Sequence, residues 1–282
     1  MNKNKSLKQI SRQLISFITY YSGACFLLDK LYAKNSVRIL CYHGVNQSPT
    51  NQYSIATSDF ASQVEFLKKN YKIISIDQLA TLLAENQPIP PKTIAISFDD
   101  GFEDFYCCAF PILKRFNIPA TSFIPTGFVD DSVGLRNTKK LPQNDFLSWN
   151  QIREMSQSGI DFGSHTVSHN SLRKLSRKEI QYELAYSKTR LESELGKPIK
   201  GFAFPYGTFR DISPAIEPLI AELGFSWAVT SISGVNKFFS NPYRLHRTVI
   251  QKEDQLAGLK RAVKGSLDGW LVMQKLGFII KK

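Results

Sequence analysis

The sequence predicts an α/β fold, a single barrel of parallel strands that alternate with helices and that is either closed or incomplete. Short apolar runs and helical patterns alternate along the chain from residue 37 to residue 250. The apolar run at residues 93–98 ends in two carboxylates and a glycine, which is typical of a buried parallel strand leaving its sheet. The 282 residues are 43% hydrophobic, enough for one large core, and no segment rich in Pro, Gly or Ser divides them.

Each expected element follows from a local pattern. Strands are expected where apolar residues run together, and helices where apolar residues recur every three to four positions. Ser58 precedes such a helical pattern and is expected to cap it, and prolines at residues 88–91 form a stiff lead into the strand at 93–98. The expected strands are residues 37–42, 71–74, 93–98, 120–125, 160–162, 201–204, 226–230 and 243–250. The expected helices are residues 58–70, 76–84, 102–116, 149–158, 176–196 and 214–223.

Two segments are assigned by composition. Residues 126–146 are rich in Gly, Asp, Asn and Lys, which predicts a long functional loop. The helix at 176–196 carries Glu183 and Glu192 among several basic residues, which predicts a solvated outer face.

Residues 1–34 are expected to associate with a membrane or to anchor the chain in one. Lys3, Lys5, Lys8 and Arg12 precede a mostly apolar stretch at 14–28. That stretch is shorter and more polar than the ~20 apolar residues of a spanning helix. No small-residue cleavage site follows convincingly. An uncleaved anchor or interfacial helix is therefore favoured, ahead of a removed signal and of a soluble helix.

The remaining chain divides into a catalytic domain at residues 35–252 and a basic amphipathic helix at residues 253–282. In the second segment, apolar residues alternate with Lys and Arg, a pattern whose commonest meaning is packing of a helix on its own domain. The expected location is membrane-associated or in the cell envelope, with the extracytoplasmic side favoured over the cytoplasmic membrane face.

The charge balance limits the possible partners. A net charge of +12 favours a polyanionic neighbour, either an acidic glycan or an anionic membrane surface, although it also serves general solubility. Nucleic acid is not expected, since no RNA- or DNA-binding motif is present. Four cysteines do not make a disulfide framework in a chain of this length and do not indicate the compartment. The oligomeric state is not predicted.

The chemistry is concentrated in two motifs. Asp99 and Asp100 follow the strand at 93–98, and His165 and His169 are spaced so that both imidazoles converge on one ion if the segment is helical or tightly turned. Two histidines and one carboxylate leave open positions on a divalent metal, as a catalytic site requires. The second carboxylate is then free to act as a base. These residues predict a metal-dependent hydrolase.

Four motifs together resemble the polysaccharide deacetylases, the family 4 carbohydrate esterases. They are Ile-Ser-Phe-Asp-Asp-Gly at 96–101, Trp-Asn-Gln-Ile-Arg-Glu-Met at 149–155, Gly-Ser-His-Thr-Val-Ser-His at 163–169 and Phe-Ala-Phe-Pro-Tyr-Gly at 202–207. Each alone is weak, but four in order over residues 37–250 are specific. The resemblance implies a distorted, incomplete (β/α) barrel. It also implies metal-dependent removal of N-acetyl groups from sugars, commonly polymers of N-acetylglucosamine, so an N-acetylated glycan is the expected substrate.

The resemblance also implies a division of labour. Asp100, His165 and His169 correspond to the metal ligands, with Zn²⁺ expected first and other first-row divalent ions next. Asp99 corresponds to the general base.

Three further residues take their roles from the resemblance. The backbone N–H of Tyr206 corresponds to an oxyanion donor, presented by a turn that Pro205 constrains. Trp149 corresponds to a wall of the active site, although on its own it is equally typical of a core residue at a helix start.

The sequence departs from the common family pattern in two places. The arginine that often precedes Pro-Tyr and orients the base is missing, and Arg247 or Arg244 in the last expected strand is the candidate replacement. The late Leu-x-x-His that supplies the acid is also missing from the C-terminal region, but Leu-Cys-Tyr-His ends the first expected strand at His43. This arrangement resembles the circularly permuted branch of the family, which includes poly-N-acetylglucosamine deacetylases. His246 is the second candidate for the acid.

Two other classes of function remain open from sequence. A metallohydrolase or oxygenase acting on a different amide, ester or other substrate would use the same ligand set. A catalytically inactive glycan-binding or membrane scaffold protein would be expected to lose the base or a ligand, whereas this chain retains Asp99, Asp100, His165 and His169.

Overall fold

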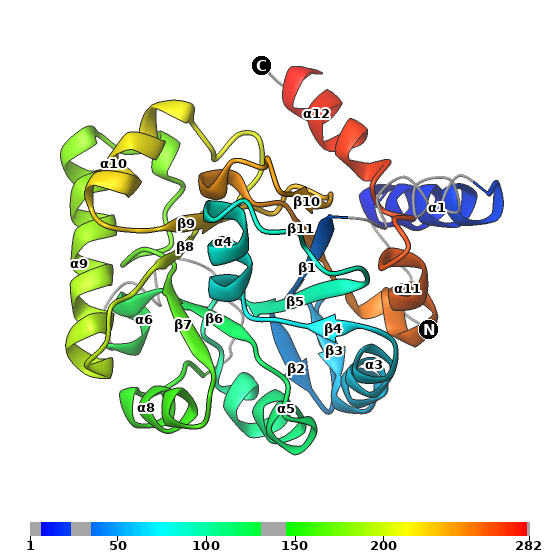
Figure 1. The fold of residues 1–282 in the computed structure, drawn as a ribbon, viewed down its shortest axis with the longest axis horizontal. Helices are drawn as coiled ribbons and strands as arrows, with labels where there is room; N and C mark the ends of the chain where they lie inside the picture. The colour runs from blue at the N-terminus through cyan, green and yellow to red at the C-terminus, as the bar shows by residue number, and fades with distance from the viewer. Residues whose placement is uncertain (1–6, 24–34, 131–144, 281–282) are drawn as a thin grey trace.

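The structure is a computed structural model that describes residues 7–23, 35–130 and 145–280. A mostly parallel sheet curls into a barrel with helices around it (Figure 1). The sheet runs in the order β10 (Asn236–Lys237), β1 (Ser36–Tyr42), β5 (Thr93–Phe98), β6 (Thr121–Ile124), β7 (Asp161–Ser164), β8 (Gly201–Ala203) and β9 (Trp227–Val229). Outside this path, β11 (Arg247–Val249) pairs with β1, β4 (Lys72–Ile73) pairs with β5, and β2 (Gly44–Asn46) pairs with β3 (Ser54–Ala56).

The barrel is incomplete, as predicted. β1 is parallel to β5 on one side, with Cys41 opposite Ser97, and parallel to β11 on the other, with Ile39 opposite Arg247. Between β9 and β11 the ladder is reduced to an isolated bridge from Val229 to Leu245. The chain end therefore returns beside β1, which brings residues 150 or more positions apart to one rim.

Three of the described α-helices begin at serine caps. Ser75, Ser148 and Ser176 each accept a hydrogen bond from the backbone three residues on and form complete capping boxes. α3 instead starts after Ala56 without a side-chain cap, so the predicted cap at Ser58 is wrong. The helices are α1 (Leu7–Tyr21), α3 (Thr57–Asn70), α4 (Ile76–Ala84), α5 (Phe110–Phe116), α6 (Thr126–Val129), α8 (Trp149–Gln157), α9 (Arg177–Leu195), α10 (Glu217–Glu222), α11 (Gln255–Ala262) and α12 (Trp270–Ile280).

Alternation along the strands separates two cores. Ile39 and Ala95 belong to the cluster inside the barrel, which α4 closes at one end with Ile76 and Leu79. The neighbouring residue Leu40 belongs to the larger cluster between strands and outer helices. This alternation matters for function, because Ser97 and Asp99 continue the inward-facing row that begins at Ala95.

Several expected elements are corrected by the structure. The predicted helix at 102–116 begins with a π-helical turn, Phe105–Ala109, before α5. The predicted strand at 243–250 starts only at Arg247, because Pro242–Arg244 forms a 3-10 turn. The single helix predicted at 253–282 is a 3-10 turn followed by α11 and α12, interrupted where Gly265 adopts a φ of 92°. In the predicted loop at 126–146, α6 occupies the start, and residues 131–144 lie outside the described part.

The N-terminal helix packs against the C-terminal ones, although they are at opposite ends of the sequence (Figure 1). Arg12 makes a bidentate ion pair with Asp254, at 3.0 and 2.9 Å, and the side chains of both residues are buried. Arg12 also donates a hydrogen bond to the Val249 carbonyl. Ser16 bonds Ser266 at 2.8 Å. Within the described ranges, no helix is both long enough and apolar enough to cross a bilayer. Residues 1–6 and 24–34 of the predicted anchor segment lie outside them.

Candidate metal and catalytic site

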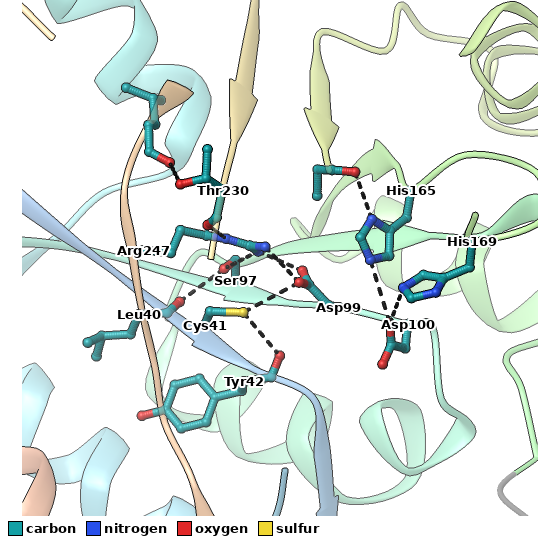
Figure 2. A network of polar contacts seen from close by, with 12 residues as sticks. Leu40, Cys41, Tyr42, Ser97, Asp99, Asp100, His165, His169, Thr230 and Arg247 are labelled. Atoms are coloured by element: carbon teal, nitrogen blue, oxygen red, sulfur yellow. Dashed lines mark hydrogen bonds and ion pairs between the residues drawn. The ribbon is translucent and has the colours of Figure 1, made fainter. Parts of the chain in front are cut away.

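The predicted metal ligands converge at the C-terminal rim of the barrel. Asp100 follows β5, while His165 and His169 follow β7 two strands away (Figure 2). Parallel strands end at the same rim, so the topology brings these segments together. The ligand-type atoms of the three side chains all lie within 4.8 Å of one another.

The spacing of these atoms fits a divalent metal. His165 Nε2 and His169 Nε2 lie 3.5 and 3.2 Å from Asp100 Oδ1. Two donors about 2.1 Å from one ion, at angles of about 90–109°, are separated by about 3.0–3.4 Å. The other ring nitrogen of His165, Nδ1, lies 2.8 Å from the Ala203 carbonyl, so Nδ1 carries the proton in the neutral ring and Nε2 presents its lone pair. The donor set therefore fits a metal with open positions.

Unusual backbone geometry accompanies these ligands. Asp100, Thr166, His169 and Tyr206 all have φ between 56° and 73°, in the left-handed region that non-glycine residues seldom adopt. Such conformations persist where surrounding structure enforces them, and they concentrate at functional sites.

Glu183 supplies part of that enforcement. Its carboxylate accepts hydrogen bonds from the backbone N–H of Val167 at 2.7 Å and of Ser168 at 2.9 Å, and also bonds the Ser168 hydroxyl. Glu183 is buried, so the predicted solvated role of this residue is wrong. The N–H groups of the tight histidine turn need an acceptor, and α9 provides it.

Arg247 holds the predicted base. Its Nη1 and Nη2 donate to Asp99 Oδ1 and Oδ2 at 2.6 and 2.7 Å, and its Nε donates to the Thr230 carbonyl at 2.7 Å. Both side chains are buried. Burial raises the pKa of Asp99, but the Arg247 charge and hydrogen bonds outweigh it and leave that pKa below its usual value. Arg244, the other candidate, lies in the 3-10 turn and pairs with Glu217, so it does not hold Asp99.

His43 lies beside Asp99, the predicted base. It follows β1 directly and lines the same cavity as Asp99 and the metal ligands. Its ring stands 5.1 Å from the ring of Tyr53, and one of its nitrogens lies within 4.8 Å of Asp99 and of Cys41 Sγ. Its buried Nδ1 has no hydrogen-bond partner among the described residues.

His246 lies elsewhere. Its backbone N–H and carbonyl both pair with Asn236, and its ring packs over Gly234. It is not among the residues that line the catalytic cavity. Burial lowers its pKa, with Asp268 acting in the opposite sense. This position outside the cavity favours His43 as the acid.

Comparison with known proteins decides the family. The family model described as polysaccharide deacetylase matches residues 86–226. The poly-beta-1,6-N-acetyl-D-glucosamine N-deacetylase of Staphylococcus aureus is 30% identical over 247 residues, covering 79% of this chain and 81% of that protein. The chain belongs to the polysaccharide deacetylase family.

Solved structures agree with this assignment. The Streptococcus pyogenes deacetylase PplD, in complex with acetate, superposes with a TM-score of 0.70 at 26% identity, over 81% of this chain and 98% of that one. IcaB from Ammonifex degensii superposes with a TM-score of 0.69 at 26% identity, over 82% and 98%. The predicted family resemblance and the distorted, incomplete barrel are both confirmed.

Tyr206 and Trp149 are also predicted site residues. In this polysaccharide deacetylase only Tyr206 lies at the cavity. Tyr206 forms the apex of a tight turn, closed by a 2.7 Å bond from the Gly207 N–H to the Pro205 carbonyl, and its ring lies 5.0 Å from His169. Trp149 does not line the catalytic cavity. Its indole N–H donates to Asp130 at 2.8 Å and Arg190 stacks on its ring at 4.6 Å, so the prediction of an active-site wall is corrected.

The deacetylase cavity has a wall that sequence reasoning missed. Its volume is about 900 Å³, and besides the residues above it is lined by side chains from both ends of the chain. These are Gln9 and Arg12 from α1 and Trp270 and Gln274 from α12. Gln274 is held by bonds to the Ser233 N–H and the Ser231 carbonyl. The sequence signals were the basic and apolar stretches at the N-terminus and the amphipathic pattern at the C-terminus, and neither identifies which residues a helix face will contact.

Proposed function

We propose that this protein is a metal-dependent deacetylase that hydrolyses N-acetyl groups of N-acetylated glycans. The observation that carries the proposal is the convergence, in one cavity, of a 2-His-1-carboxylate set with a second carboxylate held by Arg247. Asp100, His165 and His169 would hold the ion. A divalent ion bound there would supply Lewis acidity, which polarises the acetamide carbonyl and lowers the pKa of water.

The chain's own residues would complete the reaction. Arg247 keeps Asp99 ionised and fixed in orientation, so that Asp99 accepts the proton of the attacking water. Water oxygen bonds to the acetyl carbon, the carbon–nitrogen bond breaks, and acetate leaves. His43 supplies the proton that the departing amine needs, and the Tyr206 N–H stabilises the negative charge that develops on the carbonyl oxygen.

An N-acetylglucosamine polymer is the proposed substrate class. The support is the name of the S. aureus relative, a poly-beta-1,6-N-acetyl-D-glucosamine N-deacetylase, together with the volume of the cavity, about 900 Å³. Zn²⁺ is the proposed ion, because two imidazoles and one carboxylate suit it and leave open positions.

Removing the metal should abolish acetate release, and restoring it should recover the activity. The test is to treat the full-length protein with a chelator, add back Zn²⁺ or another first-row divalent ion, and measure acetate released from oligomers of β-1,6-linked N-acetylglucosamine. Acetate release that the chelator leaves unchanged would contradict the metal proposal. A metal-loaded protein that hydrolyses simple acetate esters or amides but no glycan in a panel would contradict the substrate proposal.

Replacing His43 with Ala should lower kcat about 10²–10⁴-fold at unchanged metal content, because the amine then leaves without its proton donor. His246→Ala is the matched control and should change kcat little, since His246 lies outside the cavity. Metal analysis and steady-state kinetics on both variants give the comparison. The reverse ranking would assign the acid to His246.

A further inference from the structure

α1 exposes the face that a helix of a globular protein normally buries. Its buried side chains are polar, Arg12 and Ser16, and both are bonded to the C-terminal region. Five of its large apolar side chains point outward and are 48–64% exposed, Ile10, Leu14, Phe17, Ile18 and Tyr21, whereas Ile15 and Tyr20 are half-buried. These five recur at helical spacing and form one stripe. An exposed apolar stripe on a helix that is anchored by its polar face marks a contact site for an apolar partner.

α12 also exposes apolar side chains. Its exposed large hydrophobic residues are Val272, Met273 and Leu276, and the helix packs beside α1. Of the fourteen exposed large hydrophobic residues in the described chain, eight lie on these two helices. The concentration on one small part of the molecule distinguishes them from apolar residues scattered singly over a surface.

A basic cavity adjoins α1. Its volume is about 590 Å³, and it lies between α1, α3, α11 and the starts of β1 and β5. Four cationic side chains line it, Arg38, Lys92, Lys260 and Lys264, against the single carboxylate of Asp268. Asp268 is already paired with Arg38, at 2.6 and 2.9 Å. The three lysines therefore remain in excess, and the buried Nε of Arg38 has no partner in the part of the chain that the structure describes.

The cavity is continuous with the apolar stripe. Tyr20 lines the cavity, with the Lys264 ammonium 5.8 Å from the centre of its ring. The Tyr20 ring contacts that of Tyr21 at 5.2 Å, and Tyr21 contacts Phe17 at 4.3 Å. Aromatic rings between a cationic site and an apolar stripe are the arrangement found at the level of lipid headgroups.

We propose that α1, α12 and the basic cavity form a docking surface for an anionic phospholipid membrane, with a lipid phosphate in the cavity and the apolar stripe among the acyl chains. The net charge of +12 complements such a membrane and opposes packing of a second copy on the same face. This proposal goes beyond the deacetylase activity and does not depend on it.

Docking in this way would hold the catalytic cavity beside the membrane. Gln9 and Arg12 line that cavity from the opposite face of the helix whose stripe meets the lipid. Glycan close to the membrane surface would then reach the metal site first.

The test measures binding of the full-length protein to vesicles by cosedimentation. One set contains equal parts phosphatidylglycerol and phosphatidylcholine, and the other phosphatidylcholine alone, each at low and high ionic strength. Binding should be strong to the first set and weaken at high salt. The triple variant Lys92→Gln, Lys260→Gln, Lys264→Gln should lose about fivefold in affinity per lysine, on the order of a hundredfold in all.

Two comparisons make the result specific. The triple variant Lys178→Gln, Lys197→Gln, Lys200→Gln removes the same charge on or next to α9, away from the cavity, and should bind almost as the natural protein does. Leu14→Ser with Phe17→Ser should weaken binding to both vesicle sets. The proposal would be overturned if the natural protein did not bind anionic vesicles, or if the two lysine variants lost the same binding affinity. A dimer in solution that the Leu14 and Phe17 changes dissociate would also overturn it, since a second copy would then cover the stripe.

Discussion

Asp99→Asn should retain the metal and lower kcat by about 10²–10⁴-fold, because the amide cannot accept the proton of the attacking water. Both oxygens of Asp99 face Arg247, and Asp100, not Asp99, lies within 3.5 Å of the two histidine nitrogens. Metal content and acetate release, measured on the same preparation, give the result.

Asp100→Ala is the matched comparison for the adjacent carboxylate. It should lose both the metal and the activity, because two imidazoles alone hold a divalent ion weakly. The fold should persist, since the barrel interior is filled by apolar side chains such as Ile39 and Phe123. If Asp99→Asn also loses the metal, the division of labour between the two carboxylates is wrong.

Arg247→Gln should strongly destabilise the fold, lowering the free energy of unfolding at neutral pH by about 3–5 kcal/mol. Arg247 is fully buried, and its loss leaves Asp99 as an uncompensated buried charge. Arg244→Gln is the control. Its ion pair with Glu217 is partly exposed, so the expected loss is at most about 1 kcal/mol. Denaturant unfolding of both variants measures the difference.

Arg247→Gln should also shift the pH dependence of catalysis. In the natural protein, Arg247 lowers the pKa of Asp99 against the effect of burial, so the carboxylate stays ionised into the acid range. This depressed pKa stabilises the fold above the pKa of the unfolded chain, and the benefit is lost as the pH falls through the folded value. Without Arg247, burial raises the pKa of Asp99 instead. The acid limb of the kcat/KM profile should then move to higher pH.

Arg247→Lys tests whether charge alone is sufficient. A lysine ammonium cannot reproduce the two parallel hydrogen bonds to Asp99, nor the third to the Thr230 carbonyl. We expect it to restore part of the stability and to leave the acid limb between those of the natural protein and Arg247→Gln. An unchanged profile in Arg247→Gln would show that Arg247 does not control the ionisation of Asp99.

Much of the site was determined by the sequence itself. Asp99 and Asp100 end an apolar strand, and His165 and His169 follow another, so their meeting at one rim follows from parallel pairing. His43 was predictable for the same reason. Strand ends are local features of the sequence, and parallel pairing of the strands places them at one shared edge.

Other contacts were decided by tertiary structure. The sequence offered Arg247 first and Arg244 as the alternative, and the 3-10 turn before β11 together with the pairing of β11 with β1 decides between them. The buried role of Glu183 was not predictable, because its partners are backbone N–H groups in a turn that forms only in the fold.

The two ends of the chain show most clearly what the sequence alone could not predict. Basic residues before an apolar stretch were visible at the N-terminus, and an amphipathic pattern was visible at the C-terminus; both indicated helices. The patterns did not show that Arg12 would be buried against Asp254, 242 positions away, or that the apolar side of α1 would be the exposed one. A periodic pattern specifies that a helix has two faces, whereas burial of either face depends on which distant surface offers a partner for its charges and hydrogen bonds.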